Sequence, residues 1–140
     1  DRNYLLNQIK IFLGSYAAEQ LKLKITTAGV DSDFASALGI ARNMVWRWGM
    51  GRSGLLGNFD ALTEYASGPH RTSPISADLQ KRLDDDVQDI LQACLKDVQA
   101  VLSQEQALLD RLAQELVAKE ELNYDEIEAI FKEFGKSRAQ

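Results

Sequence analysis

Histidine and cysteine are nearly absent from this sequence of 140 residues, which has one of each, His70 and Cys94. A single cysteine cannot form an internal disulfide, and its apolar position in a predicted helix indicates a buried small side chain, which fits a reducing compartment. His70, in SGPHRTSP, has no second His or Cys near it. Because zinc sites need several such ligands, we interpret His70 as a solvated loop residue.

An excess of positive charge and long apolar runs are also missing. The 21 acidic and 16 basic residues give a net charge of -5, the wrong sign for a nucleic-acid surface, so we expect no nucleic-acid partner. No apolar run approaches the roughly 20 residues of a membrane span, and the start, DRNYLLNQ, does not resemble a signal peptide. We expect the chain itself to be soluble. Because it lacks an initiator Met, we expect Asp1 to be internal to a longer protein.

Apolar residues recur at spacings of three and four, which predicts an all-α, compact bundle of about five helices in a single domain, 1–140. The first helix begins near Asn3, and the stretch LKLKITTAG after it is interpreted as a linker. The second runs from about Ser32 to Trp48, and Gly49 is placed to stop it. Its predicted buried stripe consists of Phe34, Ala37, Leu38, Ala41, Met44, Val45 and Trp48.

Glycine and proline interrupt any period between about 49 and 75, which predicts one long irregular loop. Such loops in compact domains are functional or mobile. Three apolar residues there are expected to be exposed, either as a subunit contact or where missing structure once packed, and they predict self-association of the chain. They are Leu55, Leu56 and Phe59.

The last third is predicted to be helical. Ser76 is placed to cap a helix that ends near Leu102, and Ser103 with Gln106 has capping-box spacing for the next one. The same spacing recurs at Asn123 with Glu126, and Gly135 is expected to end the last helix. The acidic run 84–86 suggests metal binding, but consecutive helical positions point about 100° apart, so we interpret it as a solvated face.

Four segments in order match a known pattern, and the first three are LGSYAAEQL (13–21), TTAGVDSDF (26–34) and ASALGIARNMVWRWGM (35–50). They resemble LGGRAAEE, TTGASNDL and a helix that ends in ARxMVxxxGM in the peptidase domain of the FtsH family of membrane-anchored, ATP-dependent zinc metalloproteases. SADLQKRLDDDVQDIL with AQELVAKEELNYDEIEAIF resembles the closing helices of the family. The resemblance covers about residues 3–134 and implies the C-terminal helical part of the peptidase domain.

The resemblance implies a role for Asp33. In the family the catalytic zinc is held by two histidines of an HExxH helix and by the aspartate of the TTGASNDL pattern. Asp33 takes the place of that aspartate, because its spacings to ARNMV match, so the resemblance implies that Asp33 is the third zinc ligand. The glutamate of HExxH would act as general base toward the zinc-bound water.

That glutamate and both histidines are absent, so we expect no catalytic residue in this chain and no zinc bound by the chain alone. The GxxxxGK[ST] loop is absent too, and the resemblance implies that ATP and magnesium bind to an AAA+ module outside this sequence. Two explanations are open. The chain is a fragment from downstream of the HExxH helix, which the missing Met favours, or it is a relative that has lost its catalytic half.

The sequence also departs from the family pattern. One extra residue lies between Thr27 and Asp33, which makes Asp31 a rival ligand. The usual second Gly, Arg and second Glu of the LGGRAAEE pattern are replaced by Ser15, Tyr16 and Gln20. These departures indicate a divergent member.

The resemblance implies a layout and a function. The zinc-ligand-bearing helical half is about 3–50, the loop 51–75, the C-terminal helices 76–134 and the tail 135–140. The chain would be part of an ATP-dependent zinc metalloendopeptidase that degrades membrane and soluble proteins, inactive when isolated. The alternative is a non-catalytic helical oligomerisation module, and a third reading, an unrelated helical regulator, requires the motif order to be coincidence.

The family also implies partners and a location. We expect a homo-oligomer, a hexamer in the parent, that acts on protein substrates. We expect the soluble face of a membrane-anchored parent, on the bacterial cytoplasmic side or its organellar equivalent. The membrane is reached only through N-terminal segments absent from this sequence.

Overall fold

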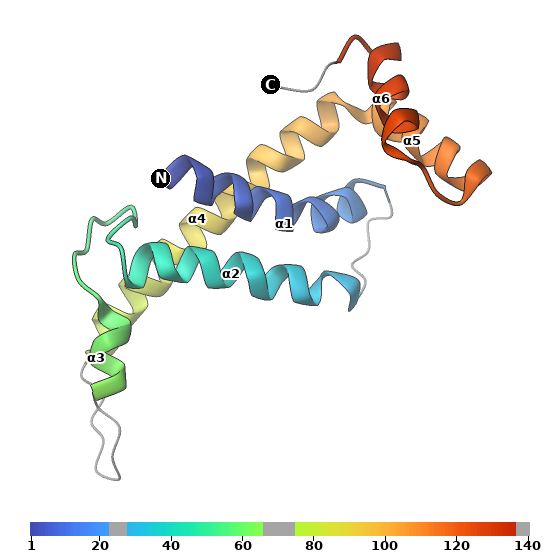
Figure 1. Cartoon of the computed structure of the whole chain (residues 1–140). Helices are drawn as coiled ribbons and strands as arrows, with labels where there is room; N and C mark the ends of the chain where they lie inside the picture. Colours follow the sequence, from blue (N-terminus) through green and yellow to red (C-terminus); the bar gives the residue numbers. More distant parts are fainter. Residues whose placement is uncertain (23–27, 66–74, 137–140) are drawn as a thin grey trace. The chain divides into compact units, whose positions relative to one another are not determined.

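The computed structural model describes residues 1–22, 28–65 and 75–136, and within these ranges the chain is helical and has no strand (Figure 1). The all-α prediction is confirmed, and the helices group into two compact units, 1–99 and 100–140. That the two units make one domain stays a prediction. The elements are α1 (Arg2–Lys22), the 3-10 turn η1 (Ala28–Val30), α2 (Asp31–Trp46), α3 (Phe59–Tyr65), α4 (Ala77–Gln104), α5 (Gln106–Lys119) and α6 (Tyr124–Glu133).

In the first unit α1 and α2 lie side by side and run in opposite directions (Figure 1). The part of α4 within this unit contributes to the same apolar core. The small side chains of Ala37 and Ala41 are almost fully buried, which allows close approach between helices at these positions. The core cluster consists of Ile9, Leu13, Ala37, Ala41, Met44, Val45, Trp46, Phe59, Ile75, Leu83, Val87, Ile90 and Cys94.

Helix α2 ends at Trp46, two residues before the predicted end. Gly49 then adopts a left-handed backbone conformation with φ of 63°, as expected for a residue that stops a helix. The backbone N–H of Met50 donates a 2.8 Å hydrogen bond back to the carbonyl of Met44. Because the helical period stops at Trp46, the prediction that Trp48 is buried was wrong: Trp48 is 51% exposed and Trp46 only 3% exposed. The predicted stripe was also wrong at Phe34 and Leu38, which are exposed, and right at the other four positions.

The predicted irregular region contains the short helix α3, which was not predicted from the sequence. Its start is capped by Asn58, whose Oδ1 accepts a 3.1 Å hydrogen bond from the backbone N–H of Ala61. The Phe59 side chain is buried in the core, so its predicted exposure was wrong, whereas Leu56 is 84% exposed as predicted. Leu55 is half-buried and packs against the core, so its predicted exposure was wrong as well. Residues 66–74, which include His70, lie outside the described residues.

The predicted boundary between the two long C-terminal helices was partly wrong. Ser76 caps α4 as predicted, since its Oγ accepts a 3.1 Å hydrogen bond from the backbone N–H of Leu79. The helix continues past Leu102 to Gln104, so Ser103 lies inside it and does not cap the next helix. Helix α5 begins after Glu105, where no side chain caps it. A turn of irregular backbone at one residue is therefore enough to separate the two helices.

In the second unit α5 and α6 pack against each other. Asn123 caps α6 as predicted, because its Oδ1 accepts a 2.9 Å hydrogen bond from the backbone N–H of Glu126. Gly135, with φ of 69°, follows the end of α6 and donates to the carbonyl of Lys132. A 3.2 Å ion pair between Arg111 of α5 and Glu133 of α6 ties the two helices together.

Candidate functional site

Asp33 lies in the first turn of α2, directly after η1. Its side chain is half-buried, whereas Asp31, at the first position of the helix, is exposed. No side chain caps this helix end, so two carboxylates in the first turn interact with the positive end of the helix dipole. The helix start therefore accounts for the presence of acidic residues here, and it holds Asp33 on an element that is packed along its length.

The Asp33 carboxylate forms no hydrogen bond or ion pair with any residue that the structure describes. Within the described ranges, neither of its oxygens is taken up by another side chain or a backbone N–H. Over residues 1–22, 28–65 and 75–136, no three His, Cys, Asp or Glu side chains gather as a metal site. Catalytic zinc takes three protein ligands, so the residues present fit one ligand of a zinc site and not the whole set.

The far end of α2 is fixed by a cluster of charges around Asp60 of α3. Arg42 and Arg47 donate hydrogen bonds of 3.1 and 2.9 Å to its two carboxylate oxygens. The Arg42 guanidinium also stacks on the Trp46 ring, 3.8 Å from the ring centroid. Burial raises the pKa of Asp60, but the hydrogen bonds from Arg47 and Arg42 outweigh it and lower that pKa below 3.8. The charged cluster thereby joins α3 to α2.

The turn that follows α2 is held by a buried carboxylate of α4. Asp86 is 2% exposed and accepts hydrogen bonds from the Ser53 hydroxyl at 2.7 Å and the Ser53 backbone N–H at 3.1 Å. The interpretation of 84–86 as a solvated face was wrong for Asp86 and right for Asp84 and Asp85, which are exposed. The sequence gives no local sign of this, because the partner of Asp86 lies 33 residues away.

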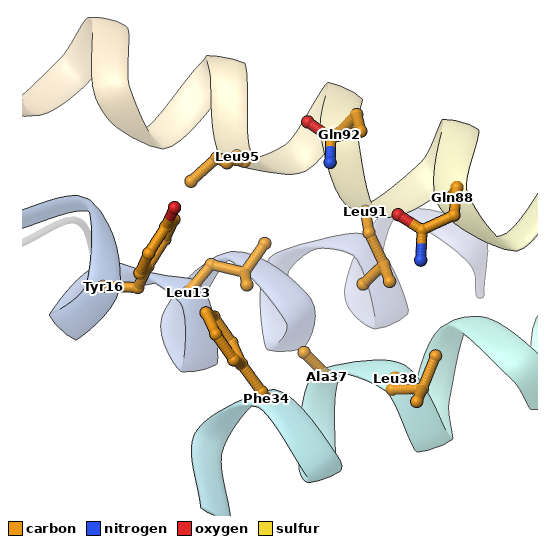
Figure 2. A pocket seen from close by; sticks show the side chains of 9 residues that line it. All are labelled: Leu13, Tyr16, Phe34, Ala37, Leu38, Gln88, Leu91, Gln92 and Leu95. Carbon is orange, nitrogen blue, oxygen red and sulfur yellow. The ribbon is translucent and has the colours of Figure 1, made fainter. Parts of the chain in front are cut away.

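An open pocket of about 300 Å³ lies among α1, α2 and α4 (Figure 2). Tyr16 of α1 and Phe34 of α2 form one wall, with ring centroids 4.9 Å apart in an edge-to-face arrangement. Phe34 directly follows Asp33 in the sequence, so the pocket opens beside the start of α2. The other lining residues are Leu13, Ala37, Leu38, Gln88, Leu91, Gln92 and Leu95.

Cys94 is buried, as its apolar position predicted. Its Sγ donates a weak hydrogen bond of 3.8 Å to the carbonyl of Leu6, which links α4 to α1. Burial raises the pKa of the thiol, so little thiolate is present at neutral pH. Cys94 is therefore a core residue.

The structure places the two candidate zinc ligands close to each other. Asp31 and Asp33 share the first turn of α2, so one helix start presents both candidate ligands. The roles of Asp60 and Ser53 were not predicted from the sequence. Asp60 had a signal, since it follows the helix-capping residue Asn58, while Ser53 had none.

Comparison with known proteins decides the family. The sequence matches the model of Peptidase family M41 over residues 1–130. The chain belongs to peptidase family M41. This M41 match includes α1 to α5 and most of α6, and it confirms the family resemblance drawn from the four motifs.

Individual proteins similar to this chain support the same family. The chain is 34% identical over 133 residues to the ATP-dependent zinc metalloprotease FtsH of Borreliella burgdorferi (strain ZS7), covering 93% of this chain and 21% of the relative. It is 35% identical over 133 residues to the protein of the same name from Pelodictyon phaeoclathratiforme, covering 93% and 20%. For the Thermus thermophilus protein the identity is 28% over 129 residues, covering 92% and 21%.

The chain spans about a fifth of the length of these curated relatives. These relatives are named zinc metalloproteases. At the level of the family, therefore, the function is that of a peptidase and the metal is zinc. Among the helices of the described residues, none is long and apolar enough to cross a membrane.

Proposed function

We propose that this chain is the helical part of an ATP-dependent zinc metalloendopeptidase that degrades membrane and soluble proteins. In this proposal Asp33 is the third zinc ligand, and the chain is inactive by itself because its sequence has no HExxH. The observation that carries the proposal is the half-buried Asp33 carboxylate at the start of α2, without a partner among the described residues. A zinc-bound water has its pKa lowered toward neutrality, which is the chemistry the metal supplies.

The residues of this chain would position that ligand. Ala37 and Ala41, one and two turns after Asp33, are 1% and 0% exposed, so the same face of α2 is packed into the core. At the other end of the helix, Arg42 and Arg47 are held by Asp60. A ligand on a helix fixed at both ends keeps its oxygen in place, and small misplacements of a ligand weaken metal binding and activity.

The matched pair Asp33→Ala and Asp31→Ala tests the assignment in the full-length protein that contains this chain. Both substitutions remove a carboxylate from the same helix turn, so the loss of dipole stabilisation is similar. We expect Asp33→Ala to lose stoichiometric zinc, measured by atomic absorption, together with cleavage of an unfolded protein. Asp31→Ala should retain both. The reverse pattern would make Asp31 the ligand, and full zinc in both variants would refute a carboxylate ligand from this turn.

The alternative is a non-catalytic helical module that packs the subunits of an M41-type protein. It predicts that the full-length protein binds no zinc even as wild type. The observation that favours this alternative is the exposed apolar side chain of Leu56, which is available for a subunit contact. Zinc analysis of the wild-type protein therefore separates the two functions before any variant is made.

We also propose a homo-hexamer that acts on protein substrates, on the soluble face of a membrane-anchored parent. The support is the family resemblance together with the ATP-dependent zinc metalloprotease names of the relatives. In this arrangement ATP and magnesium bind to a module outside this sequence. Sizing of the full-length protein by multi-angle light scattering would test the hexamer, and a monomer would overturn it.

A further inference from the structure

The first turn of α2 carries Asp33 and is held by apolar contacts in place of a polar cap. Its N-cap residue is Val30, and this helix end has no side-chain cap. A helix end whose N–H groups have no acceptor opens more easily than the rest of the helix. Two apolar side chains four residues apart oppose this opening: Val30 is 4% exposed, and the Phe34 ring contacts Tyr16 of α1.

Tyr16 and Phe34 form an edge-to-face pair between α1 and α2. Their ring centroids are 4.9 Å apart and the ring planes meet at 63°, which is a favourable geometry for an aromatic pair. Figure 2 shows the Phe34 ring extending from the start of α2 toward Leu13 and Tyr16. Tyr16 shares a face of α1 with Leu13 and Ala17, which are 5% and 1% exposed. The tyrosine is therefore carried by a packed stretch of helix.

We propose that Tyr16 is a positioning residue, which fixes the direction of the Asp33 carboxylate through the ring of Phe34. Asp33 and Phe34 are consecutive, so their side chains leave the helix about 100° apart. When the Phe34 ring is held against Tyr16, the rotation of this turn about the helix axis is fixed, and the Asp33 side chain is fixed with it. This inference rests on the proposed function, in which Asp33 binds zinc.

The Asp33 carboxylate depends on this indirect support. It forms no hydrogen bond or ion pair with any residue in 1–22, 28–65 and 75–136, so polar contacts within these ranges do not orient it. An edge-to-face pair changes an equilibrium constant by a factor of about three to ten beyond the effect of the apolar area that it buries. Loss of the Tyr16 ring should therefore open the first turn of α2 more often and leave the rest of the first unit folded.

Hydrogen exchange in this chain without metal tests the role of Tyr16 directly. The amides of residues 35–37 donate to the carbonyls four positions earlier, so their exchange rates report on the first turn of α2. In Tyr16→Leu we expect these amides to exchange about three to ten times faster, with no such change at Met44 near the other end of α2. Tyr16→Phe should exchange as the wild type does, because the ring makes the contact with Phe34.

Phe12→Leu is the matched control, since it replaces another half-buried ring of α1, one turn before Tyr16. The loss of core packing in this variant should raise exchange at residues 35–37 and at Met44 to the same extent. Unchanged exchange at residues 35–37 in Tyr16→Leu would overturn the proposal. The same local acceleration in Phe12→Leu or in Tyr16→Phe would overturn it as well.

Zinc binding by the full-length protein that contains this chain tests the consequence for the metal. Tyr16→Leu should bind zinc about three to ten times more weakly in competition with a chromophoric chelator, and Tyr16→Phe and Phe12→Leu should keep the wild-type affinity. Wild-type zinc affinity in Tyr16→Leu would overturn the proposal. If Asp33→Ala retained its zinc, the proposed function would fail, and the exchange measurement without metal would still decide whether Tyr16 fixes this turn.

Discussion

Ser53 donates two hydrogen bonds to the same carboxylate, that of Asp86, from its hydroxyl at 2.7 Å and from its backbone N–H at 3.1 Å. The two residues are 33 positions apart, on the turn after α2 and on α4. One buried side chain thus orders a turn rich in glycine, where the loss of backbone freedom on folding is large. This contact between distant segments is therefore expected to stabilise the turn.

Removing the Asp86 carboxylate should destabilise the chain. Asp86→Ala leaves the Ser53 N–H and hydroxyl without their acceptor and opens a small cavity, so we expect a loss of about 2 to 4 kcal/mol in the free energy of unfolding. Urea denaturation followed by circular dichroism measures it. Asp84→Ala, at an exposed neighbouring position, should change stability by no more than about 0.5 kcal/mol. Equal effects of the two variants would contradict the role given to Asp86.

A methyl group at Gly51 should disturb the same contact from the other side. A Cβ added there would lie 2.6 Å from Oδ2 of Asp86, so we expect Gly51→Ala to cost about 1 to 3 kcal/mol. The control is Gly39→Ala in the interior of α2, where nothing lies within 4 Å of the added carbon. There we expect a gain of about 0.5 to 1 kcal/mol from helix propensity. Thermal unfolding measures the stability of both variants. A stabilising Gly51→Ala would show that the turn can move away from Asp86.

Acid should weaken the charged cluster at α3. The hydrogen bonds from Arg47 and Arg42 outweigh burial and hold the pKa of Asp60 below 3.8. The ionised Asp60 carboxylate therefore contributes fully to the free energy of unfolding at pH values above this ordinary pKa. This contribution is lost as pH falls through the lowered pKa of the folded state. Unfolding free energies from about pH 5 to about pH 2 should therefore fall less steeply in Asp60→Asn than in the wild type.

Asp85→Asn serves as the comparison for this acid titration. Asp85 pairs with Lys81, but the two side chains are 61% and 73% exposed, so the ion pair is screened by solvent. Its variant should keep the wild-type slope. A wild-type slope in Asp60→Asn would mean that the two arginine contacts do not stabilise the folded chain.

Two polar residues that look alike in the sequence should differ in effect. Asn123→Ala removes the cap of α6, and we expect a loss of about 1 kcal/mol and faster amide exchange in the first turn of that helix. Ser103→Ala should be neutral or slightly stabilising, because Ser103 lies inside α4. Hydrogen exchange by mass spectrometry would follow both variants, and a destabilising Ser103→Ala would restore the capping role that the structure denies it.

The sequence predicted those features of the fold that depend on residues close together in the chain. The spacing of apolar residues located α1, α2, α4, α5 and α6 but missed α3. The capping predictions were correct at Ser76 and Asn123, whose side-chain oxygens each accept a hydrogen bond from the backbone N–H three residues later. Capping-box spacing failed at Ser103, because a serine inside a continuous helix has the same local pattern. The predicted buried stripe failed at Trp48, because the apolar period does not show where the helix ends. It also failed at Phe34 and Leu38, which line the open pocket.

The candidate site was predictable only in part. Asp33 and its place at a helix start followed from the motifs, and the structure adds its half-burial and its lack of partners among the described residues. The contacts of Asp60 and Asp86 were not predictable, since each depends on residues brought near by the fold. The pocket beside Phe34 is likewise lined by residues of three helices, so the sequence of any one helix does not predict it.

The end of α2 at Trp46 has an optical consequence. It separates the two tryptophans of the chain into an indole shielded from solvent and an indole open to it, with 3% and 51% exposure for Trp46 and Trp48. Iodide should quench the emission of Trp48 and leave that of Trp46, whose spectrum should lie at shorter wavelength. The intrinsic tryptophan fluorescence of the chain therefore reports whether the C-terminal end of α2 is folded.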